Sequence, residues 1–120
     1  MAVSLCAQQP PAGVPPPPEE DETLKGKTED YVLNPLQAQK ELKIGNYYLK
    51  KGSLNAAAKR FEEATKWDPN FAEAYLRLGE TQERLRNTKA AQAAFRKYVE
   101  LAPDAKNADS IKKKLKNPAS

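Results

Sequence analysis

The chain has 120 residues, which leaves room for one small domain. With no histidine and a single cysteine, the sequence excludes a Cys/His metal site, an internal disulfide and a histidine-based catalytic triad. It contains no apolar run of about 18 residues, the length that a membrane-spanning helix needs.

Residues 1–33 differ in composition from the rest of the chain. Six of the ten prolines fall between Gln8 and Pro18, and an acidic run follows at residues 19–22. Such a segment cannot bury a core, so we expect a disordered, proline-rich and acidic arm. The arm has 2 basic and 6 acidic residues, net −4, whereas residues 34–120 have 18 basic and 10 acidic residues, net +8.

The first nine residues resemble the end of a secretory signal, because small residues precede Gln8 and a proline-rich stretch follows. The charged start and most of the apolar core of such a signal are missing. Two interpretations stay open: an exported protein, periplasmic or associated with the outer membrane, and a cytoplasmic protein with an ordinary disordered terminus. Cys6 resembles a lipoprotein attachment site, but Leu5 stands where that signal has a small residue.

Two stretches of the chain are similar at a spacing of 34 residues, the first beginning at Ala38 and the second at Ala72. A fixed period of this size indicates stacked supersecondary units. We therefore predict repeat 1 over residues 34–69 and repeat 2 over residues 70–103. The aligned pairs are Ile44 with Leu78, Gly45 with Gly79, Ala57 with Ala91, Phe61 with Phe95, and Pro69 with Pro103.

Each repeat is expected to form two helices, because its apolar residues recur at steps of three, four and seven. Gly52 and Ser53 suit the C′ and N-cap positions of the turn in repeat 1. Pro69 ends the second helix, and Asn70 is placed to cap the next one. In repeat 2 the turn is expected at Asn87 and Thr88.

Small residues mark where the two helices of a hairpin approach each other. Gly45 and Gly79 lie in the first helix of each hairpin, and Ala57 and Ala91 lie in the second. Glycine inside a helix costs roughly 0.5–1 kcal/mol relative to alanine. Because the glycine recurs at the same place, we expect a close helix–helix contact that offsets this cost, with an aromatic ring such as Phe61 beside it.

Residues 104–117 predict a short amphipathic capping helix. Lys112 and Lys113 would occupy the Ile-Gly position of a third repeat and cannot pack there, so the segment is a cap with a polar outer side. Its apolar side comprises Ala105, Ala108, Ile111 and Leu115.

These features together resemble the tetratricopeptide repeat over about residues 38–105. The matches are Ile44-Gly45, Tyr48, Ala57, Phe61, Ala64 and Pro69 in repeat 1, and Tyr75, Leu78-Gly79, Ala91, Phe95 and Pro103 in repeat 2. The departures are Glu41, Gln82, Arg86 and Tyr98. The resemblance implies an all-α fold with two helix-turn-helix hairpins of an α-α solenoid, followed by the capping helix.

The resemblance also implies a protein–protein interaction module, an adaptor or scaffold rather than an enzyme. In this family the first helix of each hairpin lines a concave groove that takes peptides or partner helices. Its leucines are expected to anchor a partner and its polar groups to contact carboxylates or backbone, although Leu42 and Leu49 alternatively lie under an N-terminal cap or a second copy. Carried over residue by residue, the groove comprises Leu42, Lys43, Asn46, Leu49, Lys50, Leu76, Arg77, Glu80 and Arg84.

No motif of catalysis, cofactor binding or metal binding is present in the sequence. Four carboxylates fall on predicted solvent faces, where basic side chains at helical spacing are expected to pair with them. They are Glu62, Glu63, Glu80 and Glu83. An alternative function is binding to nucleic acid or an anionic surface, because residues 34–120 are basic. Only residues 112–116 form a basic run, which disfavours that alternative.

Two repeats are fewer than the three that a stable solenoid generally needs. We therefore expect the chain to be marginally stable alone, to dimerise, or to dock on a larger assembly. The open side of its first helix, near Leu36, Lys40 and Tyr47, is the expected interface. Trp67 stands where the repeat usually has leucine and is expected in the core. If the start is a signal remnant, the setting is a bacterial envelope, where outer-membrane assembly factors of the BamD type are similar tetratricopeptide proteins.

Overall fold

The computed structural model describes residues 31–116, and every regular element among them is an α-helix. The predicted all-α fold is thereby confirmed for these residues, while nearly all of the predicted arm lies outside them. Contacts divide the chain into two units, Met1–Asp30 and Tyr31–Ser120, and the second unit contains all the described helices. These are α2 (Pro35–Lys51), α3 (Leu54–Trp67), α4 (Ala72–Arg84), α5 (Thr88–Leu101) and α6 (Ala108–Lys116).

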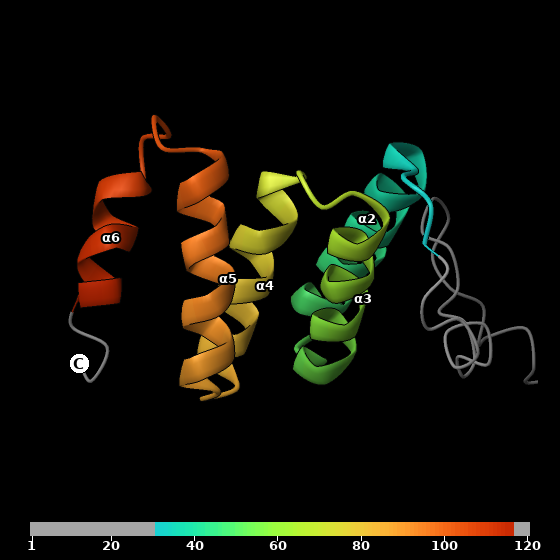
Figure 1. The fold of residues 1–120 in the computed structure, drawn as a ribbon. Coiled ribbons are helices and arrows are strands. Elements are labelled where there is room, and N and C mark those ends of the chain that lie inside the picture. Colours follow the sequence, from blue (N-terminus) through green and yellow to red (C-terminus); the bar gives the residue numbers. More distant parts are fainter. Residues whose placement is uncertain (1–30, 117–120) are drawn as a thin grey trace, which may run out of the picture. The chain divides into compact units, whose positions relative to one another are not determined.

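The helices pair in chain order. α2 packs along α3 as one hairpin, and α4 packs along α5 as a second (Figure 1). α3 contacts α4 and so joins the two hairpins, while α6 packs against α5. This is the stacking of helical units that a period of 34 residues predicts.

The two hairpin turns use the same backbone shape with different residues. Gly52 ends α2 in the left-handed region at φ +81°, and its N–H donates to Leu49 O at 3.0 Å. The residue 34 positions later is Arg86, which adopts φ +67°. A side chain in this region is strained, because Cβ crowds the following carbonyl oxygen. The next residue, Asn87, supports the turn by donating its N–H to Gln82 O at 2.9 Å.

The starts of α2 and α4 differ in their capping. The Asn34 side chain accepts the N–H of Gln37 at 3.0 Å, so α2 has a full N-cap. The prediction that Asn70 caps α4 is wrong, because the cap position is Phe71, whose side chain makes no such bond. Asn70 lies one residue too early, and its own N–H donates to the Asp68 side chain at 3.1 Å.

The predicted close contact inside each hairpin is confirmed. A Cβ atom built on Gly45 would lie 2.5 Å from Cε1 of Phe61, and one on Gly79 would lie 2.6 Å from Cε1 of Phe95. Each glycine therefore gives a phenyl ring the space that any side chain would take.

The core is divided between the junctions of the stack. One buried cluster joins α2, α3 and α4, and Trp67 packs against it, as expected for a core residue. A second cluster joins α5 to α6. The first comprises Ala38, Ala64 and Ala74, and the second Ala91, Phe95, Tyr98 and Ile111.

Candidate functional site

The nine predicted groove residues are divided between α2 and α4, and we call them the groove face. Three basic members, Lys43, Lys50 and Arg84, are exposed, and the other six are half-buried. Helical spacing places each set on one side of its own helix. The function of this face stays a prediction.

The predicted leucine anchors differ in what they contact. Leu42 packs against the cluster that joins α2, α3 and α4, and Leu76 packs against the cluster that joins α5 and α6. Both therefore stabilise the stack itself, and this packing accounts for the partial burial of Leu42 without a second copy of the chain. Leu49 belongs to neither cluster and is half-buried.

The charged side chains of α4 largely satisfy one another. Arg77 Nη1 lies 3.1 Å from Glu80 Oε1, and Arg77 Nη2 lies 3.7 Å from Glu73 Oε2. The Nε atom of Arg77 is shielded from solvent and has no acceptor among the described residues. Because its cation already lies between two carboxylates, this part of the groove face offers little free charge.

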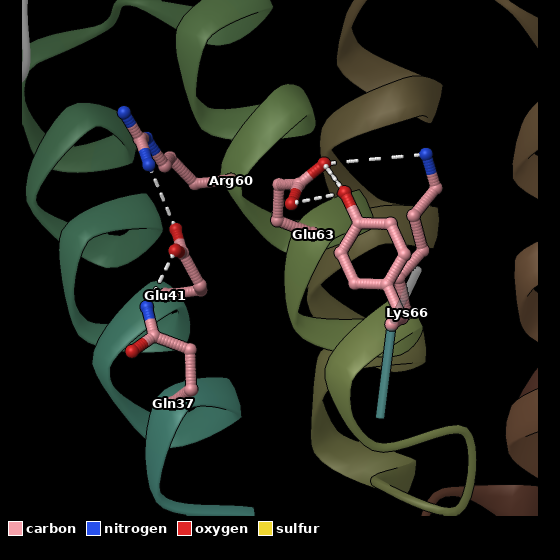
Figure 2. A network of polar contacts seen from close by, with 6 residues as sticks. Gln37, Glu41, Arg60, Glu63 and Lys66 are labelled. Carbon is pink, nitrogen blue, oxygen red and sulfur yellow. Dashed lines mark hydrogen bonds and ion pairs between the residues drawn. The ribbon is translucent and has the colours of Figure 1, made fainter. Parts of the chain in front are cut away.

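The basic side chains of α2, in contrast to Arg77 of α4, do not lie between acids on their own helix. It contains four lysines, all exposed, and a single acid, Glu41, which is buried. Arg60 Nη1 of α3 lies 2.9 Å from Glu41 Oε1, and Gln37 Nε2 donates to Glu41 Oε2 at 2.9 Å (Figure 2). The one negative charge of α2 is therefore neutralised inside the hairpin, and every charged side chain on its solvent side is basic.

Sequence reasoning noted Glu41 as a departure from the repeat but missed its partner. The residues 34 positions after Glu41 and Arg60 are Tyr75 and Ala94. Both positions of the contact thus differ between the two repeats, and both are polar in the first. This paired difference is the signal that points to the ion pair.

A second buried acid lies on α3. Glu63 was predicted on a solvent face, but it is only 7% exposed, so that prediction is wrong. The Tyr31 hydroxyl lies 2.7 and 2.9 Å from the two carboxylate oxygens of Glu63, and Lys66 Nζ is 4.0 Å away (Figure 2). The Tyr31 ring also meets Trp67 edge-on, with centroids 4.8 Å apart. The residues just before α2 therefore cover this side of α3.

The capping helix is tied to the second hairpin by an ion pair that sequence spacing did not indicate. Lys114 Nζ of α6 donates to Glu83 Oε1 of α4 at 3.0 Å, and the two residues are 31 positions apart in the sequence. The same ammonium lies 5.2 Å from the centroid of Phe95. One lysine of α6 is thus engaged within the fold, and Lys112, Lys113 and Lys116 are exposed.

The described residues contain neither a metal-binding cluster of side chains nor a helix fit to span a membrane. Between residues 31 and 116, no group of three or more His, Cys, Asp or Glu side chains is arranged to hold a metal ion. None of the described helices combines the length and the apolar character needed to cross a membrane.

Comparison with known proteins gives one positive result. A family model described as the tetratricopeptide repeat matches residues 42–106, which is more than half of the chain. The search of curated proteins finds no match. The similarity to BamD-type factors is therefore not shown.

Proposed function

Because the chain belongs to the tetratricopeptide repeat family, we propose that it is a non-catalytic interaction module whose groove face binds an acidic peptide or helix of a partner protein. The observation that carries the proposal is the charge of α2. Its lysines are exposed, and its only acid is buried against Arg60. A negatively charged partner meets attraction along this helix without an opposing charge.

The spacing of the side chains defines the partner further. Lys43 and Lys50 are seven residues apart on one helix, or about 10.5 Å along its axis. Two carboxylates at a matching distance on the partner engage both ammonium groups. Asn46 lies between them and offers one donor pair and one acceptor to a peptide backbone. Leu49, which belongs to neither core cluster, supplies the apolar contact.

Arg84 extends the positive charge to the end of α4. It is exposed, and no described acid forms an ion pair with it. Arg77 is a poorer contact because its guanidinium already lies between Glu73 and Glu80. We therefore assign carboxylate binding to Lys43, Lys50 and Arg84. The envelope setting depends on residues outside the described part and stays a prediction.

The test is selection of binding peptides from a random peptide library on the full chain, followed by fluorescence anisotropy with the enriched peptides. We expect enrichment of acidic sequences and loss of their binding in the Lys43→Glu/Lys50→Glu variant. The matched control is Lys59→Glu/Lys89→Glu, which reverses two exposed lysines on α3 and α5. Retained binding in the first variant, or equal loss in the control, would contradict the proposal.

A further inference from the structure

A second side of α2 corresponds to the sides of α4 and α6 that the preceding helix covers. α6 turns Ala108, Ile111 and Leu115 toward the hairpin before it, where Ala108 and Ile111 are buried. Ala74 and Thr81, which are 34 positions before Ala108 and Leu115, are fully buried on α4. Ala74 packs there with Ala64 of α3. The same side of a first helix is thus covered by the preceding helix at both junctions.

On α2 this side is open in the described structure. The residues 34 positions before Ala74 and Thr81 are Lys40 and Tyr47, which are exposed and half-buried. Leu36 and Lys51 continue the same stripe at helical spacing. We call Leu36, Lys40, Tyr47 and Lys51 the end face, which is distinct from the side that carries Leu42, Asn46 and Leu49.

The end face has an apolar beginning and a basic border. Leu36 is 59% exposed, and Val32 and Leu33 just before it are 75% and 65% exposed; these are the exposed large hydrophobic residues among those described. Lys51 Nζ lies 5.6 Å from the centroid of the Tyr47 ring. Apolar contact area is therefore flanked by two ammonium groups, Lys40 and Lys51, that pair with no described acid.

The charge of the face argues for a particular occupant. A second copy in a symmetric arrangement would place the lysines of one α2 against those of another. A head-to-tail copy would bring the exposed Lys112, Lys113 and Lys116 of α6 against Lys40 and Lys51. Like charges in either arrangement oppose association. An acidic helix has neither problem.

We propose that the end face binds an amphipathic helix of a different protein, with an apolar stripe for Leu36 and Tyr47 and acidic residues for Lys40 and Lys51. The partner helix takes the place that α3 takes on α4 and α5 takes on α6. The lysine stems add apolar contact while their ammonium groups reach the acids. Lys43 and Lys50 of the groove face border this stripe at helical spacing, whereas Leu42, Asn46 and Leu49 lie on another side of α2. Comparing Lys40→Glu/Lys51→Glu with Lys43→Glu/Lys50→Glu therefore separates this proposal from the proposed function.

The probe is a synthetic helical peptide with leucines at i, i+3, i+4 and i+7 and glutamates on both flanks. Amide chemical shifts of the full chain are followed by NMR during titration. We expect the largest shifts at Leu36, Lys40, Tyr47 and Lys51. A matched peptide with lysine in place of glutamate should not bind. Shifts centred on Leu42, Asn46 and Leu49, on α4 or on α6, or no binding by the glutamate peptide, would overturn the proposal.

Two variants test the residues directly. Lys40→Glu/Lys51→Glu should weaken binding of the peptide at least about tenfold, with an unchanged helical circular dichroism spectrum. The control Lys59→Glu/Lys89→Glu should leave the affinity as it is. Sedimentation equilibrium of the full chain addresses the second copy. A dimer that Leu36→Asp dissociates would mean that the chain itself occupies this face, and the proposal would be wrong.

Discussion

Glu41 and Arg60 form a buried ion pair in the first hairpin at the two positions that Tyr75 and Ala94 occupy in the second. Both side chains of the pair are less than a tenth exposed, at 6% for Glu41 and 8% for Arg60. The second hairpin thus has an aromatic and a small residue at the two positions where the first hairpin has opposite charges. The ion pair has a larger desolvation cost, since both charges leave water.

Removing one charge of this pair should be far worse than replacing both. We expect Arg60→Ala to lower the free energy of unfolding by about 3–5 kcal/mol, because Glu41 stays buried without its partner. Glu41→Tyr/Arg60→Ala copies the second hairpin and should be neutral or more stable by up to about 4 kcal/mol. Urea denaturation followed by circular dichroism measures both. A double variant as unstable as Arg60→Ala would contradict the equivalence of the two positions.

The glycines that face the phenyl rings should not tolerate even a methyl group. Alanine normally favours a helix over glycine by about 1 kcal/mol. At Gly45 and Gly79, however, the new Cβ would meet ring carbons at 2.5 and 2.6 Å. We expect a net loss of about 1–3 kcal/mol in unfolding free energy for either alanine variant. Gln39→Ala, at an exposed position of α2, is the control, and a more stable Gly45→Ala would refute the close contact.

Arg86 should become a better turn residue when it is replaced by glycine. Its φ of +67° costs a side-chain-bearing residue about 1–2 kcal/mol, and glycine avoids that cost at an entropic loss of about 0.5–1 kcal/mol. We expect Arg86→Gly to raise the thermal midpoint. Gly52→Ala should lower it, and because an added Cβ there meets no atom within 4 Å, the loss would measure backbone strain less the entropic gain of replacing glycine. A lower midpoint for Arg86→Gly than for the natural chain would contradict the assigned strain.

Tyr75 should make the fold sensitive to alkaline pH. Burial raises the pKa of Tyr75 above its ordinary 10.0; the charge of Lys97 opposes the rise and that of Asp68 adds to it. The folded state therefore holds the phenol proton more tightly than the unfolded state. The resulting stability is complete below pH 10 and is lost as pH rises from 10 through the folded pKa. The measurement is the unfolding free energy of the natural chain minus that of Tyr75→Phe at each pH. This difference should fall above pH 10, and a difference that does not change with pH would contradict the prediction.

Much of the fold was predictable because its strongest signals are local or periodic. The spacing of Gly45 and Gly79 predicted two stacked hairpins, and the structure and the family match confirm them. Gly52 marked a turn because only glycine enters the left-handed region without strain. These signals depend on residues close in sequence or exactly one repeat apart.

The polar interior was not predictable in the same way. Glu63 occupies a position that helical periodicity assigns to solvent, yet Tyr31 covers it from 32 residues away. Lys114 reaches Glu83 only because α6 folds back on the second hairpin. Such contacts depend on how separate elements meet. The groove face does not follow from local signals either, since its residues were named from the family pattern, and its binding stays a prediction.

The contact between Tyr31 and Trp67 means that the fluorescence of Trp67 can report on the segment before α2. Trp67 is the only tryptophan in the sequence, and the backbone N–H of Asn34 donates to its carbonyl oxygen at 2.9 Å. Detachment of residues 31–34 would remove both a neighbouring ring and a hydrogen bond from one fluorophore. Emission from a single residue therefore reports opening of this segment separately from the unfolding of α5 and α6, which contribute no residue to the cluster beside Trp67, with no added dye.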